Sequence, residues 1–356
     1  MIIIKMYMEE CIVLESTANS SLVRTESECC MNKGLIVVSA ILFIAASILF
    51  SGCGNKESLT LGENHSQNLT IIDDNHREVL LANTPERIVV LSPSFLEILD
   101  QVQGKVVGRA TSQIAQIPER YKDSAEVGFV YRISSEAVVS LQPDLVIAYK
   151  GMHENLLPIL EENHIPVIVL NLKTYQDVKR NCELLGLVSG HADLGQDLAK
   201  KLDNGVQDAI ANVPLVSKKT VILHTTMNDI SVETEDSIAG SVAALLHLDL
   251  AIKSGDMPIA KMNGMASPDK IVYRMEALVE KDPEVLFITS MGANGGALER
   301  IKSEMENNPA WLELQAVKNK QVFFLPENLF LLNPGLRYPE AVRYMVEQLY
   351  PKNESR

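Results

Sequence analysis

The sequence predicts an α/β protein with two lobes, each built on a central and mainly parallel β-sheet and joined by a helical segment. Short apolar runs alternate with helical stretches between residues 68 and 174, and the alternation returns between residues 216 and 350. Such alternation is typical of parallel sheets covered by helices. Residues 175–215 show helical periodicity without a strand signal. The chain has 356 residues, of which 46% are hydrophobic, which is enough for two lobes of ordinary size.

The segment "MNKGLIVVSAILFIAASILFSGC", which starts at Met31, predicts secretion. Lys33 precedes an uncharged apolar run that continues through Phe50, and small residues lead to Cys53. This order is that of a secretory signal peptide. A plain membrane anchor is the alternative, because the run is close to the shortest length that spans a bilayer. The expected organisation is an N-terminal extension outside the fold (1–30), a signal peptide (31–52), a flexible tether (53–67), a first lobe (68–174), a helical connection (175–215) and a second lobe (216–350).

Charge and cysteine content narrow the class of partner. The formal net charge is −14 and no run of Lys and Arg is present, so we expect no nucleic-acid partner, because phosphate binding needs a concentrated basic face. The cysteine spacing fits neither a zinc site nor a disulfide framework. The five cysteines are Cys11, Cys29, Cys30, Cys53 and Cys182.

Each element of the first lobe has its own signal. In "LTIIDDNHREVLLA", apolar runs flank a polar turn, which predicts a β-hairpin. "TPERIVVLSPSFLEILDQV" predicts a buried strand over residues 88–91 and a helix from about Ser94, and "KVVG" predicts another strand. "SSEAVVSLQPDLVIAYKG" and "NLLPILEENHIPVIVLN" each predict a short helix and then a buried strand, separated at Pro143 and Pro166.

The connection and the second lobe follow the same logic. A break at Ser189-Gly190 divides the connection, and a long helix is expected from about Asp193. Strand and helix signals then alternate through "TVILHTT", "SIAGSVAALLHL", "IVYRMEALVEKDPEVLFITS", "ALERIKSEMENNPAWLELQAVKNKQVFFLP" and "YPEAVRYMVEQLY". The segment "YRMEALVEKDPEVLFITSMG" repeats the order of "SSEAVVSLQPDLVIAYKG": a glutamate, a short helix, a proline, a strand and a glycine-containing loop.

Ligands of open parallel sheets bind beyond the carboxyl ends of the strands, so a cleft between two such lobes is the expected binding site. The loops at these ends carry thioethers, aromatic rings and a few polar groups, which suit a large, flat or apolar ligand. Arg337 is interpreted equally well as a solvated or helix-capping arginine. His153 fits better as a surface histidine in its predicted loop. The seven histidines share no metal-binding spacing. The side chains expected at the cleft are Tyr131, Met152, His153, Met227, Met265, Met291, Phe330 and Arg337.

Three segments, "TPERIVVLSPSFLEIL", "VGFVYRISSEAVVSLQPDLVIA" and "NPAWLELQAVKNKQVFFLP", together with the motif at Cys53, resemble the substrate-binding lipoproteins of bacterial ABC importers for iron complexes and cobalamin. The resemblance extends from about Leu69 to Leu349. It implies the class III periplasmic-binding-protein fold, with two Rossmann-like lobes joined by a long helix. It further implies a monomeric binding protein, not an enzyme, that has no cofactor of its own and delivers its cargo to an ABC permease dimer with its ATPase.

The resemblance also assigns roles to single residues. "LFSGC" is similar to a lipobox, except that Phe50 stands where leucine is usual, and this implies a lipid on Cys53 and an extracytoplasmic, membrane-anchored protein. Tyr131 and Met291 fall where haem-binding members place methionine and histidine iron ligands; packing is the other interpretation of Met291, and ring stacking of Tyr131. Glu136 and Glu276, at equivalent places in the two repeated segments, fall where members dock onto permease arginines.

Three ligands remain open: haem, a ferric siderophore and cobalamin. An iron complex is favoured, with haem and siderophore close together, because a phenolate is a hard oxygen ligand for ferric iron. Tyr131 and the methionines point towards haem. Cobalamin-binding members usually carry more tryptophan, whereas the single Trp311 lies in a segment that reads as structural. A secreted hydrolase is the alternative from another class, but the sequence contains no G-x-S-x-G elbow, P-loop or G-x-G-x-x-G motif after a predicted strand.

Overall fold

The computed structural model describes six stretches of the chain: residues 68–112, 115–214, 216–262, 265–291, 296–331 and 333–351. The expected extension, signal peptide and tether, with Cys53, lie outside the described residues. Among the helices of these stretches, none is both long and apolar enough to cross a bilayer.

The first lobe contains a six-stranded sheet in the order β6-β5-β4-β3-β7-β8, which is parallel except at β6. The apolar runs of β3, β7 and β8 are buried because helices cover both faces of a parallel sheet. The strands are β3 (Ile88–Val90), β4 (Val106–Thr111), β5 (Ala125–Phe129), β6 (Arg132–Ile133), β7 (Leu145–Tyr149) and β8 (Val167–Leu170). The helices are η1 (Pro93–Phe95), α3 (Leu96–Gln101), η2 (Glu119–Tyr121), α4 (Ser135–Ser140), η3 (Glu154–Leu156) and α5 (Leu157–Glu162).

The predicted hairpin is present as β1 (Leu69–Ile72) and β2 (Glu78–Leu81), which pair antiparallel. Its turn is closed by Asp73, whose carboxylate accepts hydrogen bonds from the backbone of Asn75 and Arg77. The same carboxylate accepts a bond from the Val169 amide, so the turn also anchors the hairpin on β8.

Two antiparallel helices, α6 (Tyr175–Val188) and α7 (Ala192–Ile210), form the connection. The break lies where the sequence places it, because Gly190 adopts a φ of +75°, which glycine tolerates without strain. Thr174 and Asp177 form a capping box at the start of α6. At the crossing, a Cβ on Gly195 would lie 2.9 Å from the Gly186 Cα, so the close approach of the two helices depends on glycine.

The second lobe contains a seven-stranded sheet in which β9, β11, β14 and β15 are parallel and β10, β12 and β13 are antiparallel. Its strands are β9 (Lys219–Thr225), β10 (Ile230–Glu233), β11 (Asp249–Leu250), β12 (Ile259–Met262), β13 (Met265–Val272), β14 (Val285–Ser290) and β15 (Val322–Phe324). Its helices are α8 (Ile238–Leu245), α9 (Met275–Lys281), α10 (Gly296–Asn307), α11 (Pro309–Glu313), α12 (Gln315–Lys318), α13 (Glu327–Phe330), η4 (Gly335–Arg337) and α14 (Tyr338–Leu349). The predicted α/β class is confirmed.

Three polar segments that we expected to be loops at the carboxyl ends of strands are partly strands themselves. "HTTMNDIS" runs from the end of β9 into β10, and "NGMASPD" enters β13. In the first lobe, "GFVYRIS" includes the end of β5 and all of β6. β10 and β13 carry Ser, Glu, Pro, Asp or Lys, and β6 has only two residues, so these strands lack the continuous apolar run of a central parallel strand.

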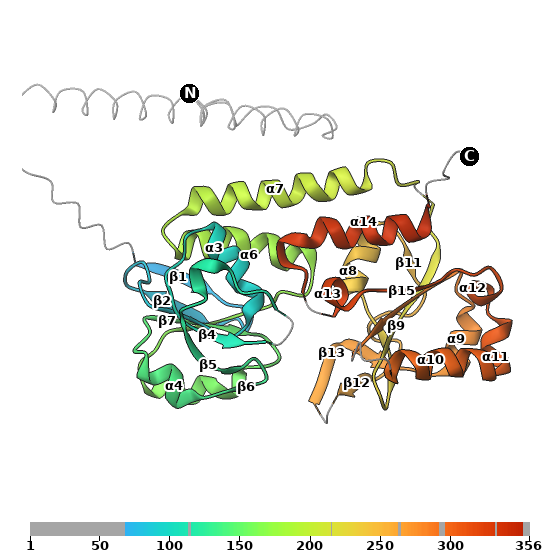
Figure 1. Cartoon of the computed structure of the whole chain (residues 1–356), viewed down its shortest axis with the longest axis horizontal. Helices are drawn as coiled ribbons and strands as arrows, with labels where there is room; N and C mark the ends of the chain where they lie inside the picture. Colours follow the sequence, from blue (N-terminus) through green and yellow to red (C-terminus); the bar gives the residue numbers. More distant parts are fainter. Residues whose placement is uncertain are drawn as a thin grey trace, which may run out of the picture. The chain divides into compact units, whose positions relative to one another are not determined.

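The helices of the connection pack into a layer that both sheets share. α7 packs on α6 and on α14 of the second lobe (Figure 1). The Tyr175 amide donates to Ser241 Oγ at 2.9 Å, and the Tyr338 hydroxyl donates to the Lys173 carbonyl at 2.7 Å. One hydrophobic core runs through α3, α6, α7, α8 and α14 and both sheets. The connection is therefore part of a common core rather than a free linker.

Candidate functional site

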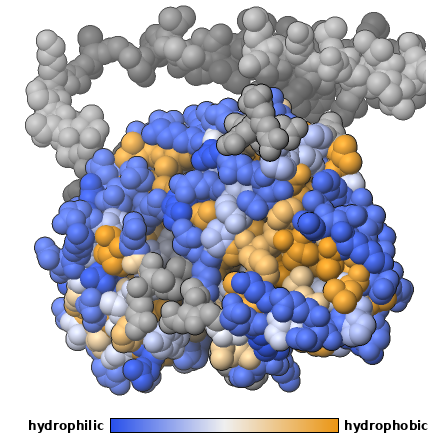
Figure 2. Space-filling model, turned by 45° about the vertical axis from the view of Figure 1, so that its right-hand side comes forward, coloured by the Kyte–Doolittle hydropathy of each residue, from blue (hydrophilic) through white to orange (hydrophobic). Residues whose placement is uncertain are grey.

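Four of the side chains expected at the cleft lie just beyond the carboxyl ends of parallel strands. Tyr131 follows β5, Met152 follows β7, Met227 follows β9 and Met291 follows β14. Figure 2 shows apolar areas set in a largely hydrophilic surface. Of the 13 large apolar side chains that are exposed among the described residues, these four are at strand ends where a ligand would bind.

Tyr131 presents an open aromatic face. Its ring is 71% exposed and stacks on Phe129, with the ring centroids 5.8 Å apart and an angle of 12° between the planes. Its hydroxyl makes no hydrogen bond to another described residue. Both the ring face and the phenol oxygen are thus available to a ligand.

His153 differs from its neighbour Met152, because its side chain is only 2% exposed. Its Nδ1 accepts a hydrogen bond from the Tyr149 amide at 3.0 Å, and its Nε2 lies 2.7 Å from the Val130 carbonyl oxygen. The imidazole is therefore neutral and protonated on Nε2, and burial lowers its pKa. Both ring nitrogens are therefore occupied, and His153 is not among the exposed residues that a ligand could contact.

The end of β7 meets the second lobe. Tyr149 packs edge-on against Phe95, with centroids 6.3 Å apart. Burial, and then the nearby charges of Asp269 and Asp177, raise the pKa of the Tyr149 phenol. Asp269 belongs to β13 of the second lobe and Asp177 to α6, so the charges that act on Tyr149 come from the second sheet and from the helical connection. Lys173, which precedes α6, forms an ion pair with Asp269 at 2.6 Å.

Met227, Met291 and Arg300 gather around the end of β9. The Met291 amide donates to the Thr225 carbonyl at 3.0 Å, and Arg300 Nη2 donates to Thr225 Oγ1 at 3.1 Å. A Cβ on Gly296, the first residue of α10, would lie 2.5 Å from the Met227 Sδ, so the thioether rests against the start of that helix. The fold thus brings together side chains from three separate segments: the loop after β9, the end of β14 and helix α10.

Arg300 is the residue that the sequence analysis missed. No carboxylate of the described residues forms an ion pair with it, and its Nε is buried without a hydrogen-bond partner among them. A half-buried guanidinium without a counter-charge attracts an anionic group. The available signal was its place early in α10, the helix that follows β14, because the start of that helix lies near the carboxyl end of the sheet.

Phe330 and Arg337 are in a different environment. Phe330 is 3% exposed and packs against Tyr344 in the common core, with centroids 6.2 Å apart. Arg337 pairs with Glu340 at 2.9 Å, next to Glu97 of the first lobe. Among the described residues, no hydrogen bond, ion pair or ring contact joins Phe330 or Arg337 to Met227 or Met291. The side chain of Met265, on β13, lies outside the described part of the structure.

A buried polar network crosses the second sheet below these residues. His224 is 1% exposed and its Nδ1 lies 2.8 Å from Thr289 Oγ1, which donates to Glu233 at 2.5 Å. Burial alone would raise the pKa of Glu233, but the neighbouring His224 Nδ1, 3.5 Å from the carboxylate, and the charge of Lys270 lower it. No cluster of three or more His, Cys, Asp or Glu among the described residues is arranged to hold a metal ion.

Glu136 and Glu276 occupy equivalent positions in the two lobes. Each is exposed in the first turn of a short helix, Glu136 in α4 and Glu276 in α9. In the first lobe α4 leads into β7, which pairs with β3, and in the second lobe α9 leads into β14, which pairs with β9. Ser134 Oγ donates to Glu136 at 3.0 Å, and hydrogen bonds from the Glu136 amide and Ser134 lower the pKa of the Glu136 carboxyl. The repeated sequence pattern therefore corresponds to a repeated structural unit.

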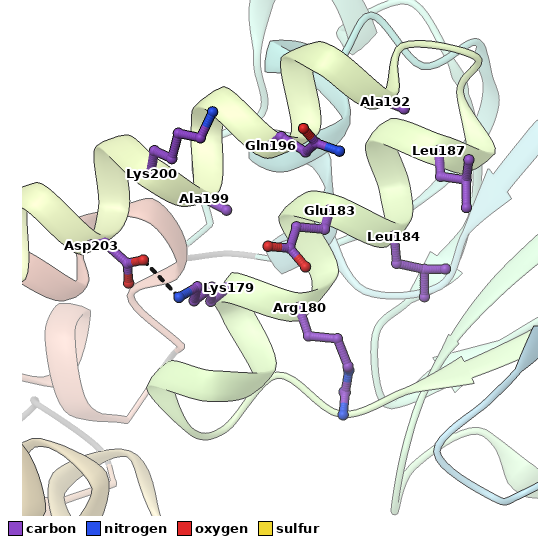
Figure 3. A pocket seen from close by; sticks show the side chains of 10 residues that line it. All are labelled: Lys179, Arg180, Glu183, Leu184, Leu187, Ala192, Gln196, Ala199, Lys200 and Asp203. Atoms are coloured by element: carbon purple, nitrogen blue, oxygen red, sulfur yellow. Dashed lines mark ion pairs between the residues drawn. The ribbon is translucent and has the colours of Figure 1, made fainter. Parts of the chain in front are cut away.

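A groove of about 590 Å³ lies between α6 and α7 (Figure 3). Its walls mix opposite charges, and Lys179 pairs with Asp203 across it at 2.6 Å. It is formed by the connection and not by strand ends, so we do not assign it to the ligand. Its lining residues are Lys179, Arg180, Glu183, Leu184, Leu187, Ala192, Gln196, Ala199, Lys200 and Asp203.

Comparison with known proteins identifies what this arrangement is similar to. The family model of periplasmic binding proteins matches residues 88–329, from β3 to α13. The Fe(3+)-citrate-binding protein YfmC of Bacillus subtilis is 26% identical over 327 residues, covering 89% of this chain and 98% of YfmC. The ABC transporter substrate-binding lipoprotein YvrC of the same organism is 25% identical over 335 residues, covering 90% and 98%.

Solved structures show the same fold. The crystal structure of Staphylococcus aureus IsdE complexed with heme superposes with a TM-score of 0.63 at 21% sequence identity. The superposition covers 74% of this chain and 98% of that one. Both lobes and their helical connection are therefore arranged as in a known binding protein.

Proposed function

Because the chain belongs to the periplasmic binding protein family, we propose that it is the extracytoplasmic substrate-binding component of an ABC importer and captures an iron complex at the strand ends of its two lobes. The family consists of binding proteins and not of enzymes, so the hydrolase alternative is set aside. The iron complex is cargo that is released to the permease, and no resident cofactor takes part.

One observation carries the proposal: side chains suited to an iron complex are exposed at the strand ends of both lobes. Tyr131 offers a phenol, which as phenolate is a hard oxygen ligand for ferric iron. Met227 and Met291 offer polarizable thioethers that adapt to a large ligand surface. A ligand held from both sides would bury all three.

Arg300 supports an anionic complex. Ferric citrate, carboxylate siderophores and the propionates of haem all carry negative charge, and a guanidinium without a counter-ion binds a carboxylate through two parallel hydrogen bonds. The relatives fit this class, since YfmC is named for Fe(3+)-citrate and IsdE for heme. We therefore propose haem or a ferric carboxylate siderophore as cargo, with cobalamin as the alternative.

Delivery would rely on two further features. A lipid on Cys53 would hold the monomer at the membrane face, where the tether raises its effective concentration near the permease. Exposed Glu136 and Glu276, one on each lobe, would then orient the loaded protein on basic residues of the permease dimer. The lipoprotein YvrC supports the anchoring step.

The test is a titration of the purified protein with haem, ferric citrate, ferric siderophores and cobalamin, followed by absorbance and thermal shift. We expect saturable binding of at least one iron complex, which is recovered chemically unchanged. Binding of cobalamin alone, or conversion of a ligand into a product, would contradict the proposal.

A further inference from the structure

His153 connects two loops of the first lobe that are separate in sequence. It lies in the turn after β7, directly before η3, where the amides of Met152 and His153 both donate to the Tyr149 carbonyl at 3.2 Å. From this tight turn its imidazole reaches the β5–β6 turn and donates through Nε2 to the Val130 carbonyl at 2.7 Å. Its Nδ1 accepts the Tyr149 amide at 3.0 Å, so the ring is held from both sides.

Val130 directly precedes Tyr131, and both of its backbone polar groups are bonded to neighbouring segments. Its amide donates to the Thr111 carbonyl at the end of β4 at 3.0 Å, and its carbonyl accepts the bond from His153. Gly128 permits the sharp reversal, with a φ of +115°, and a Cβ there would lie 2.5 Å from the Arg132 carbonyl oxygen. The backbone before Tyr131 is thus fixed, while the Tyr131 side chain is left open.

The requirement for histidine follows from the two bonds. One buried ring must accept a hydrogen bond on one side and donate one on the other, which a neutral imidazole does without a charge. Burial lowers the pKa of His153 and favours this neutral form. An apolar residue of similar size would leave the Val130 carbonyl and the Tyr149 amide without these partners.

We propose that His153 is a positioning residue of the ligand site, which orients Tyr131 by holding the Val130 carbonyl and fixes the spacing between the exposed side chains of Tyr131 and Met152. The inference rests on the proposed function, because Tyr131 is the residue through which His153 acts on the ligand. His153 itself does not touch the cargo.

Two substitutions separate the two bonds. The side chain of His153→Asn retains an acceptor near the position of Nδ1 but is too short to reach Val130, whereas the amide of His153→Gln can replace the Nε2 donor. We expect His153→Asn to weaken binding of ferric citrate or haem about tenfold, as for the loss of one buried hydrogen bond, and His153→Gln to restore most of it. His164→Asn, on an exposed histidine whose φ of +57° suits asparagine, is the matched control and should leave affinity unchanged.

A double-mutant cycle shows whether His153 acts through Tyr131. In a Tyr131→Ala background, His153→Asn should produce no further loss of affinity. An equal loss in both backgrounds, or no loss in the wild-type background, would overturn the proposal.

A readout without ligand keeps the inference separate from the proposed function. With 3-fluorotyrosine at position 131, the ¹⁹F resonance of the wild-type protein should report the ring stacked on Phe129. His153→Asn should shift it towards the value of free tyrosine, and His153→Gln should move it back. An unchanged resonance in His153→Asn would refute the positioning role, whereas failure to bind any iron complex would refute the proposed function alone.

Discussion

The Lys173 ammonium lies 2.6 Å from the Asp269 carboxylate, and this ion pair joins the start of the helical connection to strand β13 of the second lobe. Asp269 also pairs with Lys270 at 2.8 Å, and all three charges are largely buried. The charges of the two lysines outweigh the effect of burial and lower the pKa of the Asp269 carboxyl.

Removal of this carboxylate is expected to destabilise the protein. Asp269→Asn leaves Lys173 without its ion-pair partner, while Lys270 keeps the nearby charge of Glu233. Breaking a buried pair in this way costs about 3–5 kcal/mol. Chemical denaturation of the purified protein measures the change in the free energy of unfolding. Asp197→Asn, which removes an exposed pair with Lys200, is the control and should change stability little. Equal stability of Asp269→Asn and wild type would show that the pair does not hold the lobes together.

The same carboxyl predicts how stability depends on pH. Because its pKa in the folded protein lies below its ordinary value of 3.8, the unfolded chain binds the proton more tightly. The contribution of Asp269 is therefore complete above about pH 5 and is lost as the pH falls through 3.8 towards the folded pKa. We expect a decline in the free energy of unfolding between about pH 5 and 3 that is shallower in Asp269→Asn. Parallel pH profiles of the two proteins would contradict this.

Arg300 should determine the affinity for anionic cargo. Arg300→Gln is expected to weaken binding of ferric citrate by about tenfold or more, the effect of one hydrogen bond to a charged group. Binding of a neutral ligand should change far less. Arg343→Gln, on an exposed arginine of α14, is the matched control. Isothermal titration at two salt concentrations measures both affinities, and equal weakening by the two variants would exclude a specific role for Arg300.

The two outer glutamates should affect delivery and not capture. We expect the double substitution Glu136→Lys/Glu276→Lys to abolish uptake of the iron complex by cells, because it turns attraction to basic permease residues into repulsion. Ligand affinity in solution should not change. Glu162→Lys/Glu306→Lys, at two other exposed glutamates, applies the same change in net charge as a control. Normal uptake with the first pair would refute the docking role.

Much of the fold could be predicted from the sequence, because the central strands are continuous runs of Val, Ile and Leu. The strands β3, β7, β8, β9 and β14 all lie where such runs occur. The antiparallel strands β10 and β13 could not be predicted in this way, since Ser231, Glu233 and Asp269 give them the composition of loops. Their polar groups are buried only because the network around His224 and Lys270 satisfies them.

The candidate site was predictable to a smaller extent. The ends of the strands could be located from the apolar runs, and Tyr131, Met152, Met227 and Met291 are exposed just beyond them. The direction of a loop side chain depends on tertiary contacts that no local pattern records, and for this reason the buried bonds of His153 were not foreseen. Arg300 was missed because the helical periodicity of the sequence does not show which side chain of α10 contacts the end of β9.

The most direct test is the absorption and resonance Raman spectrum of the purified protein loaded with haem or a ferric siderophore, in the wild type and in Tyr131→Phe. Tyr344→Phe, at a tyrosine away from the strand ends, is the control. We expect iron–tyrosinate signals in the wild type and in the control, and their loss together with weaker binding in Tyr131→Phe. Identical spectra and affinities in all three proteins would contradict the claim that Tyr131 captures the iron complex.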